Sequence, residues 1–381
     1  MKVLLIGNLH LDEQTSMLLF QTVIQREVAR LGHDVRLLTP TPLLRRLPWP
    51  HRLPRKWAGY FDKFVLFPLT LKRHLRWADV VHITDHSNAM YVPRVVEKPN
   101  IVTCHDVIAI QASLGMIPGW TMSWTGRLFQ RLISRGLGRA DEIACVSHLT
   151  RRHLLALRLA EQQRVDVVLN GLNAAFAPVA PEVAASAVQR AGLGPQERYL
   201  MHIGLDLPRK NRITVLKTFI ELQRRSVANG HAPLVDKLLI VGVPLSPPLA
   251  EVALAGGVSD KVVAIQNVSH EDLCALYTRA TALLFPSLQE GFGWPIIEAQ
   301  ACGCPVFTSD LAPMNEIGGT AAVYVDPEDA DGLATAIEEA APRLDEMRRL
   351  GLENAASFSS ERMAQGYVDT YRKAIDARQT S

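Results

Sequence analysis

The sequence predicts an α/β protein built from two doubly wound domains, each a parallel sheet covered by helices on both faces. Short apolar runs typical of buried parallel strands alternate with longer amphipathic stretches. This alternation occurs in two series, separated by the Ala/Pro-rich stretch Ala174–Pro181. The 381 residues are also enough for two domains of ordinary size. We expect the two domains to face each other across a cleft.

The first series begins with Lys2–Gly7, a run of Val, Leu and Ile that predicts a strand. The next segment predicts a helix, because apolar side chains recur on one face at steps of three and four: Met17, Phe20, Ile24, Val28 and Leu31. Gly32 stands where a helix often ends, and Asp34–Thr39 starts the next strand. Further strands are predicted at Val80–Thr84, Ile101–Cys104, Ile143–Val146 and Val165–Leu169.

The second series predicts six more strands, at Tyr199–Ile203, Leu238–Val241, Val262–Ile265, Ala282–Phe285, Pro305–Thr308 and Ala322–Val325. The last stretch, Ser359–Ile375, predicts a helix because its apolar residues recur every four positions. We therefore place the first domain at residues 1–175, the second at 176–358 and a C-terminal helix at 359–381.

Charge supports a division near the middle of the chain. The sequence has 41 Lys and Arg residues against 38 Asp and Glu, a net charge of +3. Residues 1–175 carry a net charge of +10, whereas the remainder carries −7. This asymmetry suggests that the first half meets an anionic partner.

Composition excludes several classes of protein. Apolar residues make up 48% of the chain and charged residues 21%, which is unlike a disordered protein. The longest nearly apolar stretch, Phe64–Leu71, is far shorter than the roughly 20 residues of a transmembrane helix. The N-terminal apolar run ends too early for a signal peptide, and five cysteines are too few for a disulfide framework. We expect a soluble, reduced, cytoplasmic protein.

In open α/β sheets, ligands bind beyond the carboxyl ends of the strands, so the residues that follow each strand are the candidates for a site. The dinucleotide fingerprint G-x-G-x-x-G and the P-loop are both absent from the sequence. Their absence argues against a dehydrogenase and an NTPase, but not against a nucleotide that is held in another way.

Arg209 and Lys210 follow the strand predicted at Tyr199–Ile203 and precede a helix for which Asn211 is the expected N-cap. Two cations at a helix N-terminus add to the helix dipole and to free backbone N–H groups, and together these form an anion site. Adjacent basic residues on a solvated surface are the alternative interpretation.

Glu290 and Glu298 flank the start of a helix that follows the strand predicted at Ala282–Phe285. Pro295 suits the first position of this helix, and Gly303 suits the position just past its end. Two glutamates eight residues apart carry little information alone, and a glutamate near a helix start also interacts favourably with the dipole. The surrounding run E-G-F-G-W-P-I-I-E makes the pair specific.

These residues give the second half a resemblance to retaining glycosyltransferases of the GT-B fold, and most of all to glycosyltransferase family 4. The resemblance rests on the E-x7-E motif Glu290–Glu298, on P-R-K-N at 208–211 and on E-A-Q-A-C-G-C-P-V at 298–306, within residues 199–345. The first half is similar at short segments, among them T-C-H-D at 103–106. The resemblance implies two Rossmann-like domains, the first binding an acceptor and the second a nucleotide-sugar donor, with the C-terminal helix returning to the first domain.

The resemblance also implies roles for individual residues. Arg209 and Lys210 would neutralise the donor diphosphate, and Glu290 would hold hydroxyl groups of the sugar. His105 would contact the transferred sugar or the acceptor, although a structural or solvated histidine is the alternative. The remaining donor-binding residues would meet the sugar, the ribose and the base: Gly291, Phe292, Gly293, Glu298, Asn267 and Val268.

The chemistry agrees with these roles. Breaking an anomeric C–O bond places negative charge on the departing phosphate, and fixed cations bind that charge most strongly in the transition state. Arg209 and Lys210 would take the place of a divalent metal. The resemblance thus implies a retaining, metal-independent hexosyltransferase that needs no cofactor. Its donor would carry a hexose of the mannose or glucose type on UDP, GDP or ADP.

Two features depart from the family pattern. The segment after the first strand, Gly7–Ser16, contains one glycine where many members have a glycine-rich loop. Leu205 follows Gly204 where many members have arginine. Both departures concern contacts to the diphosphate, whereas the motif residues named above are all present.

The cysteines are interpreted as packing residues. Cys302 and Cys304 form a C-x-C pair with no second Cys/His pair near them in the sequence, so we do not expect a metal site there. The other three cysteines are predicted to lie in the core.

A strongly basic stretch, Arg45–Arg76, contains nine basic residues, one acid (Asp62) and six interleaved aromatic residues. This mixture suits an anionic bilayer surface. It also suits nucleic acid, or a solvated face over a helical core. We favour an enzyme on the inner face of the bacterial plasma membrane that acts on a lipid-linked or envelope glycan, and we expect no nucleic acid partner.

The same residues are compatible with two other functions. Another GT-B enzyme, such as a sugar-nucleotide epimerase, would keep the donor site without the transfer. A non-catalytic binder of membrane or nucleic acid would use only the basic stretch, and Glu290→Ala would then change nothing.

Overall fold

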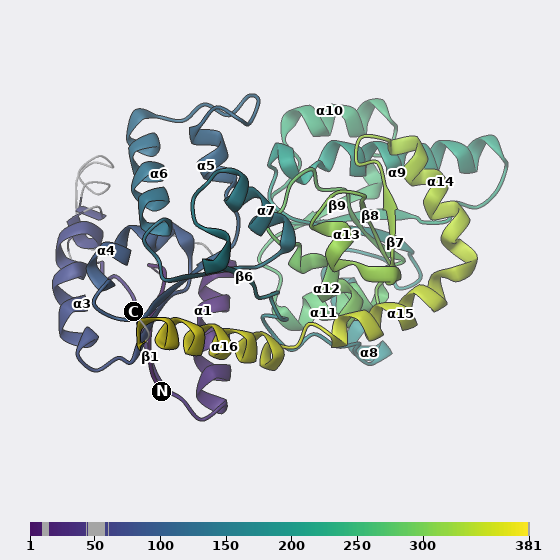
Figure 1. Ribbon diagram of the computed structural model, residues 1–381. Helices are drawn as coiled ribbons and strands as arrows, with labels where there is room; N and C mark the ends of the chain where they lie inside the picture. The colour runs from purple at the N-terminus through teal and green to yellow at the C-terminus, as the bar shows by residue number, and fades with distance from the viewer. Residues whose placement is uncertain (10–14, 43, 45–57, 60, 380–381) are drawn as a thin grey trace. The chain divides into compact units, whose positions relative to one another are not determined.

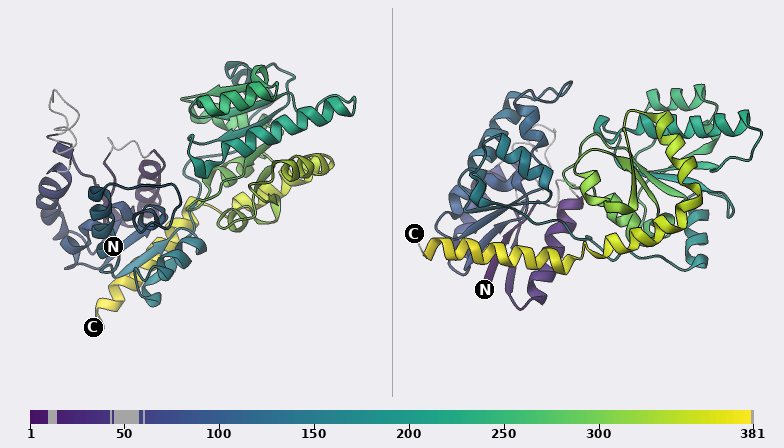
Figure 2. Two further views of the ribbon diagram at one scale, coloured as in Figure 1. Left: turned by 90° about the horizontal axis from the view of Figure 1, so that it is seen from above. Right: turned by 45° about the vertical axis from the view of Figure 1, so that its right-hand side comes forward.

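The computed structural model describes residues 1–9, 15–42, 44, 58–59 and 61–379 (Figure 1). The chain divides into two compact units, here called unit 1 (Met1–Ala174 with Ser359–Ser381) and unit 2 (Ala175–Phe358). Each unit contains a six-stranded parallel sheet with helices on its faces (Figure 2). The predicted class, two doubly wound α/β sheets, is confirmed.

Unit 1 has the strand order β2-β1-β3-β4-β5-β6. The strands are β1 (Lys2–Ile6), β2 (Asp34–Leu38), β3 (Val80–Ile83), β4 (Asn100–Cys104), β5 (Glu142–Cys145) and β6 (Val165–Val167). In the register, Val3 lies opposite both Val35 and Val80. The helical segments are α1 (Thr15–Arg30), η2 (Asp62–Leu66), α3 (Phe67–Leu75), η3 (His86–Tyr91), α4 (Val92–Val95), α5 (Ile108–Ser113), α6 (Trp124–Leu137), α7 (His148–Ala156), η4 (Gln162–Arg164) and α16 (Ser360–Gln379).

Unit 2 has the strand order β12-β11-β10-β7-β8-β9. The strands are β7 (Tyr199–Ile203), β8 (Lys237–Val241), β9 (Val262–Ile265), β10 (Ala282–Phe285), β11 (Val306–Ser309) and β12 (Ala322–Val325). The helical segments are α8 (Pro181–Arg190), η5 (Pro208–Lys210), α9 (Arg212–Ala228), α10 (Pro247–Ala255), η6 (Ser259–Lys261), α11 (His270–Arg279), α12 (Trp294–Ala301), α13 (Met314–Ile317), η7 (Gly319–Ala321), α14 (Ala330–Ala340), η8 (Ala341–Arg343) and α15 (Leu344–Ala356).

The predicted strands agree closely with the observed ones, and the differences have physical reasons. β7, β9, β10 and β12 begin and end at the predicted residues. β11 lies one residue later than predicted, because Pro305 has no N–H to donate to a ladder. Pro295 occupies the second position of α12, not the predicted first, which Trp294 takes. Gly303 follows the helix with a φ of +70°, as predicted for that position.

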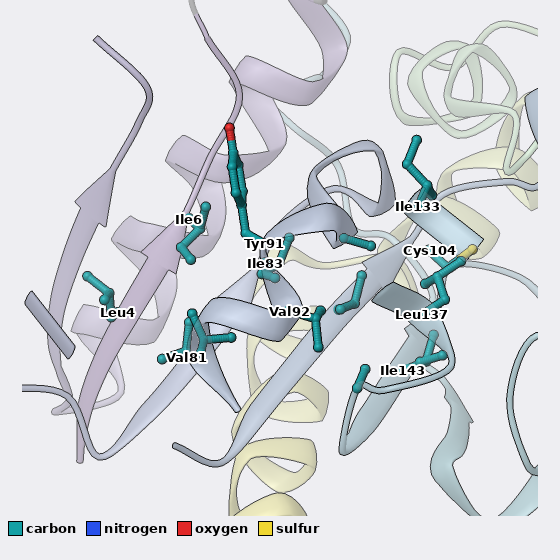
Figure 3. Close-up of a cluster of buried hydrophobic side chains, with 14 of the residues drawn as sticks. Leu4, Ile6, Val81, Ile83, Tyr91, Val92, Cys104, Ile133, Leu137 and Ile143 are labelled. Carbon is teal, nitrogen blue, oxygen red and sulfur yellow. The ribbon is translucent and has the colours of Figure 1, made fainter. Parts of the chain in front are cut away.

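The core of unit 1 is formed by apolar side chains of the central strands and of the helices that cover them. Figure 3 shows Leu4, Ile6, Val81 and Ile83 from the strands, with Leu137 from α6, all of them fully buried. Parallel strands covered on both faces need apolar residues at nearly every position, which explains why the sequence pattern located them so well. All five cysteines are buried, as predicted.

The last helix, α16, packs on α1 and on β3, β4 and β5 of unit 1 (Figures 1 and 2). The prediction that the C-terminal helix returns to the first domain is therefore confirmed. Polar contacts inside this packing fix its position. Tyr371 Oη lies 2.8 Å from His82 Nδ1, His82 Nε2 lies 2.7 Å from Thr103 Oγ1, and the Thr103 hydroxyl donates to Tyr367 Oη over 3.0 Å. Burial lowers the pKa of His82 to about 3, so the ring is neutral.

Part of the basic stretch lies outside the described residues, namely positions 45–57 and 60, which include Arg45, Arg46, Arg52, Arg55 and Lys56. The described part contains η2 and α3. Phe67, Leu71 and Leu75 are buried in the core, whereas the basic side chains at 72, 73 and 76 are exposed. In the described part, basic side chains therefore face solvent while apolar side chains of the same helix face the core. A solvated basic face over a helical core was one of the predicted alternatives. Among the described residues, no helix is long and apolar enough to cross a bilayer.

Candidate active site

The direction of strand order reverses in unit 2 between β7 and β10, which lie side by side. A reversal of this kind opens a crevice at the carboxyl ends of the two strands, where α/β proteins bind ligands. Two segments leave this point, 204–211 after β7 and 286–293 after β10. They contact each other, because the Leu288 N–H donates to the Arg209 carbonyl over 2.8 Å.

Both predicted cations pair with the predicted glutamate at this point. Arg209 Nη1 lies 2.9 Å from Glu290 Oε2, and Lys210 Nζ lies 2.6 Å from Glu290 Oε1. Arg209 Nη1 also donates to the Gln289 carbonyl over 3.2 Å. Glu290 is buried and each of its oxygens accepts from a different cation, so the three side chains carry a net charge of +1.

Asn211, the residue after the two cations, anchors the backbone in a way that the sequence did not predict. It is the residue before α9, as expected of an N-cap, but its side chain does not cap the helix. Its backbone is left-handed, with a φ of +52°, and its Nδ2 donates to the carbonyls of Pro286 and Pro327 over 3.0 and 2.6 Å. The amide thus ties the segment after β7 to the segments after β10 and β12.

Arg212, the first residue of α9, is buried and positions the start of the segment after β7. Its guanidinium donates to the Gly204 carbonyl over 2.5 Å and to the Val243 carbonyl over 2.8 Å. Gly242 lies so close that a Cβ there would sit 2.3 Å from the Gly204 oxygen. Leu205, which stands where many family members have arginine, is exposed.

The predicted glycine-containing turn leads into α12. Gly293 has a φ of +102° and precedes the helix, a conformation that favours glycine. Phe292 is buried, with its ring 5.8 Å from that of Trp294 and 6.1 Å from that of Phe358. Its side chain is therefore part of the packing, which leaves its backbone, like that of Gly291, as the part that could serve a ligand.

Glu298 lies in α12 and is buried. The hydroxyl of Tyr277, on α11, donates to Glu298 Oε2 over 3.5 Å. Burial, together with the nearby carboxylate, raises the pKa of Tyr277 well above its ordinary value, so the hydroxyl keeps its proton and remains a donor. Tyr277 was not predicted as a site residue, and its place in a helix gave no sequence signal.

Asn267 and Val268 follow β9, at the edge of the sheet and two strands away from β7. Asn267 is exposed and left-handed, with a φ of +54°. The structure therefore places the predicted base-binding pair at the same carboxyl edge of the sheet as the ion-paired cluster, beyond a strand two positions from β7.

His105 belongs to unit 1 and follows β4. It is buried, and its Nε2 lies 3.0 Å from the carbonyl of Thr84, which can only accept, so the hydrogen is on Nε2. The Phe20 ring meets it edge-on at 4.7 Å. Burial lowers the pKa of His105, although the carboxylate of Asp85 opposes the shift. The imidazole is thus neutral at pH 7, with Nδ1 as its acceptor atom.

A buried polar cluster beside His105 was missed by the sequence analysis. Asn8 Nδ2 donates to Asp85 Oδ2 over 2.5 Å, and Asn88 Nδ2 donates to Asn8 Oδ1 over 2.6 Å. Burial opposes ionisation of Asp85, but His86, His105 and the bond from Asn8 still hold its pKa below the ordinary value. Asp85 directly follows the strand predicted at Val80–Thr84, a position that could have marked it.

Among the residues that the structure describes, no three His, Cys, Asp or Glu side chains lie close enough together to hold a metal ion. At the reversal point of unit 2, the positive charges beside Glu290 are those of Arg209 and Lys210. Such a cluster can bind an anion with two negative charges once Glu290 turns to another partner.

Solved structures define the class of fold. The chain superposes on sucrose-phosphate synthase from Thermosynechococcus elongatus with a TM-score of 0.74 at 19% identity, covering 99% of both chains. It superposes on Anabaena HepE in complex with UDP and glucose with a TM-score of 0.73 at 14% identity, covering 98% of this chain and 100% of that one. Together with the two sheets and the returning helix, these likenesses show the GT-B fold.

The sequence defines the family within that fold. The model of the glycosyl transferases group 1 matches residues 197–341, and that of Glycosyltransferase Family 4 matches residues 23–176. This chain belongs to the family 4 glycosyltransferases of group 1.

Two proteins of similar sequence have different named activities. The O-antigen chain mannosyltransferase B of Escherichia coli is 26% identical over 312 residues, 79% of this chain and 77% of that protein. The D-inositol 3-phosphate glycosyltransferase of Mycobacterium sp. (strain KMS) is 31% identical over 243 residues, 62% of this chain. The match spans about half, 53%, of that second relative.

Proposed function

We propose that the protein is a retaining, metal-independent hexosyltransferase that uses a nucleoside diphosphate sugar and transfers the hexose to a hydroxyl of an envelope glycan or a lipid-linked acceptor. The observation that carries the proposal is the pairing of Arg209 and Lys210 with the two oxygens of Glu290 at the reversal point of unit 2. In the proposal unit 2 binds the donor, and unit 1, with the C-terminal helix, binds the acceptor.

Arg209 and Lys210 bind the donor diphosphate and take the place of a divalent metal. Negative charge grows on the leaving phosphate as the anomeric C–O bond breaks, so the two cations stabilise the transition state more than the ground state. Their backbone is held by Asn211 and by the Leu288 N–H. This rigidity means that little reorganisation is needed when the charge develops.

Glu290 is the counter-ion of the two cations until the donor binds. The diphosphate then takes over the cations, and the carboxylate turns to hydroxyl groups of the sugar. The E-x7-E motif places this residue in a turn whose glycine backbone, at 291 and 293, lies next to it in the chain. Glu298 accepts hydrogen bonds from the ribose hydroxyls while Tyr277 holds its other side, and the base stacks near Asn267 and Val268.

His105 accepts a hydrogen bond from a hydroxyl of the transferred sugar or of the acceptor through Nδ1, since its Nε2 donates to Thr84. In the retaining reaction the acceptor hydroxyl attacks the anomeric carbon on the face that the leaving group departs from. The C–O bond to the diphosphate breaks, and the acceptor proton passes to a departing phosphate oxygen. The products are the new glycoside and the nucleoside diphosphate.

The name of the Escherichia coli relative supports a hexose of the mannose type and an envelope glycan as acceptor. The high net positive charge of residues 1–175 supports work at an anionic surface, such as the inner face of the plasma membrane. The enzyme would then be cytoplasmic and peripheral to that membrane.

Calorimetry with UDP, GDP and ADP tests the proposal and identifies the base. We expect one of the three to bind, and Lys210→Met to weaken that binding about tenfold or more, because a charge-assisted contact to phosphate is lost. Lys217→Met is the matched control, since Lys217 is an exposed lysine of α9, just after the same segment. The proposal is wrong if no nucleotide binds at millimolar concentration, or if both variants weaken binding equally.

A further inference from the structure

Unit 1 carries an exposed apolar surface that the proposed site does not use. It lies in the turn between α5 and α6 and in the first turns of α6 (Figure 1), residues 114–128, here called the apolar tip. Five large side chains in this short segment are exposed to a marked extent: Leu114 (61%), Met116 (56%), Trp120 (46%), Trp124 (74%) and Leu128 (48%).

The apolar tip is exposed because the buried residues of α6 all lie in the second half of the helix. Gly136 lies so close to η3 that a Cβ there would sit 1.9 Å from the Ala89 carbonyl oxygen, and Ile133 and Leu137 are buried. Earlier in α6, Phe129 is partly buried and its ring lies 6.1 Å from that of Phe64, and the helix also contacts α5. The second half of α6 is thus packed in the core, while its first turns present Trp124 and Leu128 to solvent.

The backbone of the apolar tip is ordered by its own hydrogen bonds. The Met116 N–H donates to the Gln111 carbonyl over 3.0 Å, and the Trp120 N–H donates to the Ile117 carbonyl over 3.3 Å. Ser123 caps α6, accepting from the Gly126 N–H over 3.2 Å. The exposed side chains are therefore displayed by a defined turn and not by a frayed end.

A row of arginines lies beside the apolar side chains on the same helix. Arg127, Arg131 and Arg135 are four residues apart and all exposed, so they line one face of α6. From Val107 to Ala140 the sequence contains no acidic residue. Within the described part of the chain, none of the three guanidinium groups pairs with a carboxylate. The surface combines uncompensated positive charge with two tryptophans.

We infer that the apolar tip and the arginine row of α6 form a docking surface for an anionic lipid bilayer. Tryptophan and leucine side chains enter the boundary between headgroups and acyl chains, while the arginines stay at the level of the lipid phosphates. This inference deepens the proposed function, because it names the surface by which the enzyme would reach a lipid-linked acceptor. It concerns a segment distinct from the basic stretch Arg45–Arg76.

Other occupants fit the surface less well. Two copies of this chain meeting symmetrically would set the arginine rows against each other, and like charges across an interface are unfavourable. Nucleic acid would use the arginines, but it would leave Leu114, Met116 and Leu128 without an apolar partner. A bilayer with anionic headgroups accommodates both kinds of side chain at once.

Co-flotation of the full chain with vesicles of phosphatidylcholine, with and without phosphatidylglycerol, tests the inference. We expect binding that requires phosphatidylglycerol and weakens with salt, accompanied by a blue shift of tryptophan fluorescence. The double variant Trp120→Ser/Trp124→Ser should lose about tenfold or more in partition coefficient, and so should Arg127→Gln/Arg131→Gln. Because all four side chains are exposed, we expect both variants to fold.

Leu254→Ser in unit 2 is the matched control, since this leucine is 73% exposed and lies far from α6 in the sequence. Lys72→Gln/Arg73→Gln on α3 measures the contribution of the basic stretch. The inference is overturned if the wild-type chain ignores anionic vesicles, or if the tryptophan variant binds them as well as the wild type does.

The inference is also overturned if the tryptophan variant abolishes self-association or nucleic acid binding in place of vesicle binding. Nucleotide affinity, measured on the same preparations by calorimetry, separates this outcome from the proposed function. Loss of vesicle binding with nucleotide affinity intact counts for the docking surface alone, whereas absent nucleotide affinity counts against the transferase.

Discussion

Lys210 Nζ lies 2.6 Å from Glu290 Oε1, although 80 residues separate the two in the sequence. The side-by-side placement of β7 and β10 brings them together, since each residue follows the carboxyl end of one of these strands. Arg209 contacts the other oxygen, so in the proposed function the carboxylate occupies the place that the donor diphosphate would take.

Replacing Glu290 should separate binding from turnover. In Glu290→Gln the two cations lose their competing carboxylate, so the affinity for the nucleoside diphosphate should hold or rise. Sugar transfer should fall roughly a hundredfold or more, because the group proposed to hold the sugar hydroxyls no longer carries charge. Calorimetry and initial rates of transfer measure the two effects. Unchanged turnover in a folded variant would mean that the chain is not a transferase of the proposed kind.

Replacing Glu298 should weaken the binding only of nucleotides whose ribose carries hydroxyl groups. Glu298→Gln should weaken binding of the nucleoside diphosphate about tenfold to a hundredfold, the range for a hydrogen bond to a charged group. The loss should vanish with the 2′,3′-dideoxy nucleotide, which has no hydroxyl for the carboxylate to accept from. Glu251→Gln, at an exposed position of α10, is the control. Equal losses for both nucleotides would assign Glu298 a structural role.

Removing the hydroxyl of Tyr371 should destabilise unit 1. Tyr371→Phe leaves His82 Nδ1 buried without its 2.8 Å partner, at a cost of about 1–3 kcal/mol in the free energy of unfolding. Urea denaturation measures the change. Arg372→Gln on the same helix is the control, because its ion pair with Asp369 is largely exposed and contributes little. Equal effects of the two variants would contradict a stabilising role for the buried contact.

Stability should fall as the solution is acidified below pH 6.5. Burial lowers the pKa of His82 to about 3 and that of His202 to about 4, so the native state keeps both rings neutral where the unfolded chain protonates them. The unfolded state then binds more protons between about pH 4 and pH 6.5, and the free energy of unfolding rises with pH across this window. Above pH 6.5, the two neutral rings make their full contribution to the free energy of unfolding.

His202→Asn tests this assignment. The asparagine amide can still donate to the Leu284 carbonyl, which His202 Nδ1 contacts at 2.9 Å, but it does not titrate. Urea denaturation at a series of pH values should therefore give a shallower dependence for the variant between pH 4 and pH 6.5, by up to about one proton. Identical slopes for wild type and variant would show that His202 does not contribute to the acid sensitivity.

Much of the fold could be predicted because buried parallel strands are nearly continuous apolar runs. This pattern alone was enough to predict the bounds of β7, β9, β10 and β12. The motif residues Arg209, Lys210 and Glu290 could also be predicted as site residues, because they follow strands. Their ion pairs with one another could not be predicted, because these pairs depend on the order of strands in the sheet. Sequence periodicity does not state which strands are neighbours.

Other features depended on tertiary packing alone. Asn211 was predicted to cap a helix with its side chain, but two carbonyls from distant segments compete for its amide and a left-handed backbone results. The amphipathic pattern of α6 likewise does not show that its first turns stay uncovered. That depends on tertiary packing, in which η3 covers the second half of α6 at Gly136.

The return of α16 to unit 1 has a consequence for synthesis. The ribosome synthesises β1 to β6 first, then the whole of unit 2, and only after unit 2 the helix that carries Tyr367 and Tyr371. Until then the His82 ring and the Thr103 hydroxyl lack these two tyrosines as hydrogen-bond partners. The sheet that is synthesised first is therefore the last to be fully packed. Unit 1 therefore completes its packing only after unit 2 has been synthesised, when α16 folds onto α1, β3, β4 and β5.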